Sequence, residues 1–122
     1  MTKNPEVIII GGGLAGLTAA IHLSQKGLKI TLIEKSGFPR HKVCGEYISN
    51  EILPYLKWLG ADVSELHPTT ISNFEFSTHN GKMAKAKLPL GGFGISRYTL
   101  DYFLYQKAIE NGCIILKEAV HN

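Results

Sequence analysis

The stretch VIIIGGGLAGLTAAIHLSQKGLKITLIEK, residues 7–35, decides the fold. Residues 7–10 are a short run of β-branched side chains that ends in glycine, a pattern typical of a strand buried on both faces of a parallel sheet. Apolar residues then recur at helical spacing over 14–26, and Gly27 is well placed to end that helix. A second strand is predicted over 29–34. Strand, glycine turn, helix and strand in one short stretch indicate a βαβ unit with a right-handed crossover.

Gly11, Gly13 and Gly16 satisfy the pattern G-x-G-x-x-G between the predicted strand and helix. The first glycine permits a tight turn, the second lets a pyrophosphate approach the backbone, and the third lets helix and strand pack closely. Unpaired N–H groups and the positive end of the helix dipole stabilise phosphate charge at such a helix start. A P-loop is excluded because no G-K-[ST] follows the glycines.

Glu34 ends the second strand 23 positions after the first glycine, where a carboxylate accepts hydrogen bonds from a ribose diol. Three glycines alone make only a turn, but glycines and carboxylate together favour dinucleotide binding. The negative charge of Glu34 also disfavours a 2′-phosphate, so the predicted ligand is the ADP-ribose end of FAD or NAD and not NADP. The motif does not separate FAD from NAD.

The composition is that of a soluble globular domain, with 122 residues, 44% hydrophobic and 19% charged. The net charge of +3 comes from scattered lysines, so no nucleic-acid binding is expected. The polar start, residues 1–6, lacks the apolar core of a signal peptide, and no apolar run approaches the length of a transmembrane segment. Two cysteines provide neither a disulfide framework nor a zinc-type pair, and no histidine has ligand spacing, so we expect a cytoplasmic protein without a metal site.

Further elements follow the βαβ unit. Apolar spacing predicts a helix over 46–59, kinked or split by Pro54. A later helix is predicted over 99–111, capped by Thr99, and 113–116 reads as a buried strand that returns to the parallel sheet. Between them lies a different pattern.

Residues 73–90 alternate apolar and polar side chains on both sides of a turn at 79–81, which predicts a β-hairpin outside the first sheet. The glycine-rich stretch 91–94 is expected to be flexible. The overall prediction is an α/β fold, a Rossmann-like βαβ domain with a parallel sheet, interrupted by this hairpin.

Two segments carry a resemblance to a known family. Residues 38–46, FPRHKVCGE, resemble the P-x-x-K-x-C-G-E segment of the geranylgeranyl reductase family of flavoproteins, within the class that includes aromatic-hydroxylase flavin monooxygenases. Residues 96–101, SRYTLD, followed by Ala108 and Gly112, resemble the R-x-x-L/F-D…A…G stretch by which these proteins return from their substrate domain.

The resemblance implies FAD as cofactor, with the segment after the second strand running along it towards the flavin. It implies that Arg97 contacts the ribityl or phosphate region, although a solvated ion pair with Asp101 is the alternative. It also places the end of the last strand, at Ala119 and Val120, near the adenine. The cofactor residues assigned from motif and resemblance are Gly11, Gly13, Leu14, Ala15, Gly16, Glu34, Lys35, Lys42, Val43, Cys44, Gly45, Arg97 and Val120.

Cys44 is the candidate residue nearest the flavin, as a reactive thiol or as a small side chain that packs there. The dithiol reductases that share this fold use C-x-x-x-x-C, but Ser49 stands at the second position, which disfavours that class. The implied domains are an FAD/NAD(P)-binding domain over 1–70, a substrate-domain hairpin over 71–95 and a return to the first domain over 96–122.

The resemblance implies an FAD-dependent oxidoreductase that passes electrons from NADPH or NADH through FAD to a small organic substrate, for which it implies an isoprenoid double bond. A flavin monooxygenase acting on an aromatic or polyketide-like substrate, and a dinucleotide-binding module without turnover, remain alternatives. Two later family signatures do not occur, so we expect an N-terminal part that is inactive alone, binds FAD poorly and self-associates.

Overall fold

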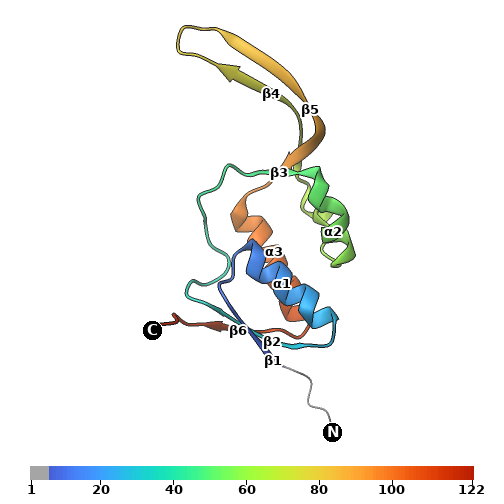
Figure 1. The fold of residues 1–122 in the computed structure, drawn as a ribbon, viewed down its shortest axis with the longest axis vertical. Helices are drawn as coiled ribbons and strands as arrows, with labels where there is room; N and C mark the ends of the chain where they lie inside the picture. Colours follow the sequence, from blue (N-terminus) through green and yellow to red (C-terminus); the bar gives the residue numbers. More distant parts are fainter. Residues whose placement is uncertain (1–5) are drawn as a thin grey trace.

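The computed structural model describes residues 6–122, and residues 1–5 of the polar start considered for a signal peptide lie outside that part. The described chain forms two sheets joined by helices (Figure 1). In chain order the elements are β1 (Glu6–Ile10), α1 (Leu14–Gln25), β2 (Lys29–Glu34), β3 (Tyr47–Ser49), the 3-10 turn η1 (Asn50–Ile52), α2 (Leu53–Trp58), the 3-10 turn η2 (Val63–Leu66), β4 (Thr69–Ser77), β5 (Met83–Gly94), α3 (Arg97–Glu110) and β6 (Ile114–Lys117).

The first sheet is parallel, in the order β1-β2-β6. Helices α1 and α3 lie side by side on one face of it (Figure 1). Ile30 and Leu32 of β2 point into that face and are almost fully buried, as are Leu17 and Ile21 of α1. The predicted βαβ unit is therefore confirmed, and the last strand does return to the parallel sheet.

Among residues 6–122 nothing covers the opposite face of this sheet, so the prediction that the first strand is buried on both faces was wrong. Ile8 and Ile10 are each 66% exposed, and Ile114 and Leu116 beside them are 46% and 38% exposed. The register brings these side chains together, because Ile8 and Ile114 both pair with Thr31 of the central strand. The apolar composition of β1 predicted burial on both faces, but α1 and α3 pack on the same face of the sheet and leave the other exposed.

We expect this apolar face to make the chain self-associate. Replacing both Ile8 and Ile114 with threonine should raise the dissociation constant of self-association by at least about tenfold. Threonine presents less apolar surface to the partner copy than isoleucine does. Sedimentation equilibrium measures it. Ile109→Thr is the control, since Ile109 is similarly exposed, at 47%, but lies on α3. Equal weakening by both variants would show that association uses another surface.

The second sheet is antiparallel, in the order β3-β5-β4. Strands β4 and β5 form the predicted hairpin as a long ribbon that projects away from the helices (Figure 1). Its turn is closed by the N–H of Thr78, which donates to the carbonyl of Lys82 at 2.8 Å, and Gly81 takes a left-handed conformation there, with φ +82°. The assignment of this ribbon to a substrate domain stays a prediction.

Strand β3 replaces the first part of the helix predicted over 46–59. Tyr47–Ser49 pairs with the glycine-rich stretch 92–94, which is thereby strand and not flexible. Gly92 permits this pairing because a Cβ there would overlap the Tyr47 ring. Helix α2 begins only at Leu53, so Pro54 falls in its first turn, where a missing N–H breaks no helical hydrogen bond and no kink results.

Helix α3 begins at Arg97, two residues earlier than predicted, and Thr99 is not its cap. The cap is Ser96, whose hydroxyl accepts a hydrogen bond from the N–H of Thr99 at 3.2 Å. Serine and threonine both suit the cap position of a helix. Because β5 already ends at Gly94, the helix can begin early enough for Ser96 to be its cap. Within residues 6–122 every helix is too short or too polar to cross a membrane.

Candidate functional site

The glycine loop joins β1 to α1 in a conformation that requires glycine at two positions. Gly11 has φ +106°, in the left-handed region, and its N–H donates to the carbonyl of Ile33 at 2.8 Å. A Cβ on Gly16 would overlap the carbonyl oxygen of Gly11, so only glycine lets helix and loop approach this closely.

The helix start beside this loop is open to a ligand. Gly13 is the N-cap of α1, and no side chain accepts a hydrogen bond from the helix's first N–H groups. Around Gly13, only the Lys42 amine, at 3.8 Å, would meet an added Cβ. Leu14 and Ala15 follow as the first helical residues. Free N–H groups, a helix dipole and a nearby amine together favour an anion here.

The carboxylate of Glu34 is held beside this loop by two backbone groups. Its Oε2 accepts from the N–H of Gly12 at 2.6 Å, and its Oε1 accepts from the N–H of Ser36 at 2.9 Å. Burial of the carboxyl, which is 8% exposed, raises its pKa, but those two hydrogen bonds and the charges of Arg40 and Lys42 outweigh it. The pKa of Glu34 therefore lies below its ordinary value, and Oε1, which accepts one hydrogen bond, keeps a lone pair for a further donor.

A cavity of about 210 Å³ lies at the carboxyl ends of the parallel strands. Four of the predicted cofactor residues line it: Gly11, Glu34, Lys35 and Val120. Ligands of open α/β sheets bind at this end of the strands. Glu34 thus borders a crevice next to the glycine loop.

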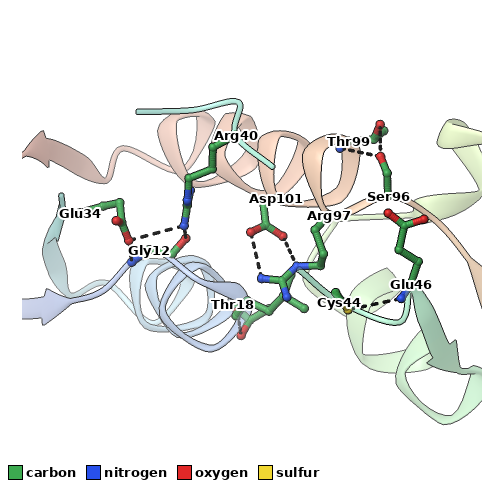
Figure 2. A network of polar contacts seen from close by, with 11 residues as sticks. Gly12, Thr18, Glu34, Arg40, Cys44, Glu46, Ser96, Arg97, Thr99 and Asp101 are labelled. Atoms are coloured by element: carbon green, nitrogen blue, oxygen red, sulfur yellow. Dashed lines mark hydrogen bonds and ion pairs between the residues drawn. The ribbon is translucent and has the colours of Figure 1, made fainter. Parts of the chain in front are cut away.

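The segment over 41–46 leads from this crevice to β3 without regular structure. Val43 is fully exposed, and Cys44 is an exposed free thiol whose sulfur accepts from the N–H of Glu46 at 3.4 Å. Nothing would lie within 4 Å of a Cβ on Gly45. Figure 2 shows Cys44 near Arg97, at the opposite end of the site from Glu34.

Arg97 forms a two-point ion pair with Asp101 one helical turn later (Figure 2). Its Nε and Nη2 donate to the carboxylate oxygens at 2.7 and 3.0 Å. This hydrogen bonding with Asp101, together with the carboxylate's charge and Cys44, raises the pKa of Arg97 in spite of partial burial. The pair is buried, with side-chain exposures of 11% and 0%, so the solvated pair considered from sequence was wrong.

The predicted residues therefore fall into two groups. One comprises four residues that line the crevice, Gly11, Glu34, Lys35 and Val120, and five that lie in or beside the adjoining glycine loop and the start of α1, Gly13, Leu14, Ala15, Gly16 and Lys42. The other lies towards β3 and the start of α3: Val43, Cys44, Gly45 and Arg97. Across residues 6–122, no three His, Cys, Asp or Glu side chains gather as a metal site would need.

Part of this chain is similar to a known protein family. Residues 6–45 match the family described as FAD dependent oxidoreductase. They span β1, the glycine loop, α1, β2 and the segment as far as Gly45. The match covers about a third of the chain, and this segment is similar to that family. The FAD dependence of the family agrees with the ADP-ribose site predicted from the glycines and Glu34.

Known proteins that are similar to this chain carry the names of different activities. Tryptophan 2-halogenase of Chondromyces crocatus is 38% identical over 61 residues, which are 50% of this chain and 12% of the relative. Digeranylgeranylglycerophospholipid reductase of Sulfolobus acidocaldarius is 48% identical over 46 residues, 36% of this chain and 10% of that protein.

A solved structure is similar over nearly the whole chain. The tetrameric form of 2-methyl-3-hydroxypyridine-5-carboxylic acid oxygenase superposes with a TM-score of 0.82 at 32% identity, covering 95% of this chain and 32% of that one. The chain thus spans less than a third of the length of each of these three proteins.

One residue of the site was missed in the sequence. Arg40 contacts both the glycine loop and Glu34, because its Nη2 lies 2.9 Å from the carbonyl oxygen of Gly12 and 3.5 Å from Oε2 of Glu34. The sequence shows it only as one basic residue in a loop. Its separation of 28 residues from Gly12 leaves no periodic signal that would have paired the two.

Proposed function

We propose that this chain supplies the ADP-binding end of the FAD site in an oxidoreductase that passes reducing equivalents from a nicotinamide through FAD to an organic substrate. The observation that carries the proposal is the crevice of about 210 Å³ between Gly11, Glu34 and Val120. Next to it, the start of α1 has no side-chain cap, so its first N–H groups suit a diphosphate, and the ionised carboxylate of Glu34 suits a ribose. These groups fit the adenosine diphosphate part of FAD.

In this proposal each group of residues has a separate task. Glu34 accepts hydrogen bonds from the ribose hydroxyls, while the first N–H groups of α1 and the amine of Lys42 offset the diphosphate charge. Lys35 and Val120 border the adenine end of the crevice. At the other end, Cys44 and Arg97 face the flavin side. Bound FAD supplies the hydride and electron chemistry, and the protein orients it and excludes water.

For the substrate we propose an isoprenoid double bond, with NADPH or NADH as electron donor. The support is the FPRHKVCGE segment and the 48% identity to the Sulfolobus phospholipid reductase. The two free cysteines, Cys44 and Cys113, suit a reducing compartment, and we propose the cytoplasm.

A flavin monooxygenase is the second candidate, and the likeness to the pyridine-carboxylic acid oxygenase over 95% of the chain favours it. The two activities separate by their products. In the intact enzyme, a reductase gives a saturated isoprenoid without stoichiometric oxygen uptake. A monooxygenase consumes one oxygen for each hydroxylated product. A module that only binds the dinucleotide shows neither, and its flavin would not bleach with NADPH.

The binding proposal is tested by Glu34→Gln. We expect the dissociation constant for FAD to rise about 10- to 100-fold, because a neutral amide gives up the charge-assisted bonds to the ribose. Quenching of FAD fluorescence measures it. Glu75→Gln is the matched control, since Glu75 is an exposed carboxylate on the ribbon.

Equal affinity of the Glu34→Gln and Glu75→Gln variants would refute the ribose contact. Affinity should also fall at acid pH. Because the pKa of Glu34 is depressed, its contribution is complete at neutral pH and is lost as the pH falls through that depressed value.

A further inference from the structure

We propose that Arg40 is the positioning residue of the nucleotide site, fixing the carboxylate of Glu34 and the backbone of Gly12 in one arrangement. Its importance for a ribose and a diphosphate rests on the proposed function. Its role in holding Glu34 and Gly12 together stands on the geometry of the chain alone.

Three contacts close a ring around Arg40 (Figure 2). Its Nη2 donates to the carbonyl oxygen of Gly12 at 2.9 Å and lies 3.5 Å from Oε2 of Glu34. That same oxygen accepts from the N–H of Gly12 at 2.6 Å. Both backbone groups of Gly12 are thereby tied to the Arg40 and Glu34 pair. A shift of any one member lengthens bonds to the other two.

The guanidinium is oriented by aromatic packing as well as by hydrogen bonds. It lies over the Phe38 ring at 4.3 Å, and Phe38 stacks on Tyr105 of α3 with centroids 4.5 Å apart and an interplanar angle of 15°. The Phe38 ring also reaches Gly12, where an added Cβ would lie 2.9 Å from it. The Arg40 side chain is only 16% exposed. It is therefore held in place and does not sample solvent as a surface arginine would.

One nitrogen of the Arg40 guanidinium has no acceptor among the described residues. This nitrogen, Nη1, is buried. A buried N–H without an acceptor is destabilising, so closing the loop does not by itself account for a guanidinium here. Arg40 contributes instead through the charge and direction that it imposes on Glu34.

The charged groups around Glu34 make this role measurable. Arg40 and Lys42 act from the loop, Lys35 follows Glu34 directly, and Glu118 lines the same crevice after β6. Burial raises the pKa of Glu34, and the bonds from Ser36 and Gly12 and the two cations lower it. Removing Arg40 takes away one lowering cause and loosens the Gly12 bond. The carboxyl should then titrate at higher pH.

The first measurement uses the free chain and needs no ligand. Carbon-13 NMR follows the Glu34 carboxyl, and the Gly12 amide reports its hydrogen bond, in the natural chain and in Arg40→Met and Arg40→Lys. In Arg40→Met we expect the pH midpoint of the Glu34 titration to rise, and the Gly12 amide to lose the chemical shift that its hydrogen bond to Glu34 produces. In Arg40→Lys the titration midpoint of Glu34 should return part of the way to that of the natural chain, but the Gly12 amide shift should not return. Lys85→Met, which removes a cation from the exposed ribbon, should change neither.

Unchanged midpoints and an unchanged Gly12 amide in both Arg40 variants would overturn the positioning role. If Arg40→Met does not fold, Arg40→Lys decides the question, because it keeps the charge but is too short for both contacts.

The second measurement separates this role from the proposed function. FAD titrations across pH should show at least a tenfold loss of affinity in Arg40→Met. The fall in FAD affinity at acid pH should also begin at a higher pH in this variant than in the natural chain. If the natural chain binds no FAD while the NMR changes occur, the proposed function fails and the positioning role stands. If FAD binds the natural chain and Arg40→Met equally, with the same fall in affinity at acid pH, the positioning role fails and the proposed function stands.

Discussion

Arg97→Met is expected to lower the free energy of unfolding by about 3–5 kcal/mol. The substitution leaves the carboxylate of Asp101, which is 0% exposed, without the cation that donates to both of its oxygens. A buried charge that loses its partner is among the most destabilising single changes. Urea unfolding followed by circular dichroism measures the difference.

Lys107→Met is the control for this experiment. Lys107 also pairs along α3, at 3.5 Å from Glu110, but that carboxylate is 63% exposed. Exposed pairs contribute little, so this variant should lose no more than about 0.5 kcal/mol. A loss in Arg97→Met as small as in Lys107→Met would contradict the importance of the buried pair.

The same pair separates the structural role of Arg97 from a role in binding the cofactor. Replacing Arg97 and Asp101 together with methionine and leucine removes both charges and should recover much of the lost stability, because well-packed apolar side chains often replace a buried ion pair at little cost. If Arg97 also contacts FAD, the double variant stays weak in FAD binding although its fold is restored.

Gly16→Ala is expected to lower the free energy of unfolding by about 3 kcal/mol, at the upper end of the effects of overpacking. The new Cβ would overlap the carbonyl oxygen of Gly11 and lie 3.5 Å from the side chain of Ile9. The overlapped atom belongs to the backbone, so relief requires α1 to move away from β1. Thermal and urea unfolding both measure this loss.

Two other glycines distinguish this steric effect from backbone strain. Gly27 has φ +85° but open space around it, so Gly27→Ala should cost about 1 kcal/mol from the left-handed conformation alone. Gly45 has open space and no such φ, so Gly45→Ala should cost almost nothing. If Gly16→Ala costs no more than Gly27→Ala, the close approach of helix and loop is not what requires glycine at position 16.

Local patterns predicted the parts of the fold whose contacts are local. The continuous β-branched run and the helical spacing that follows it marked β1 and α1, because each pattern lies within one element. The glycines and Glu34 could be placed together because the ends of neighbouring parallel strands meet at one edge of the sheet.

Parts set by distant contacts were missed. Strand β3 has only three residues, too few for alternation to show, and it exists because the glycines of β5 let it approach. The role of Arg40 depends on contacts with Gly12 and on the stack with Phe38, which no spacing reveals. Exposure of Ile8 and Ile10 follows from which side the helices take, and a strand's own residues do not encode that choice.

The irregular segment over 41–46 is a tether with both ends fixed. Arg40 fastens one end to the glycine loop, and the pairing of Tyr47 with Gly94 fastens the other to the ribbon sheet. Six residues extend to about 20 Å at most, so the two fixed ends cannot move apart beyond that distance. Moving the ribbon sheet away from the glycine loop beyond that distance would therefore pull on the backbone beside Cys44. The position of the ribbon sheet and the position of the glycine loop are mechanically coupled in this way.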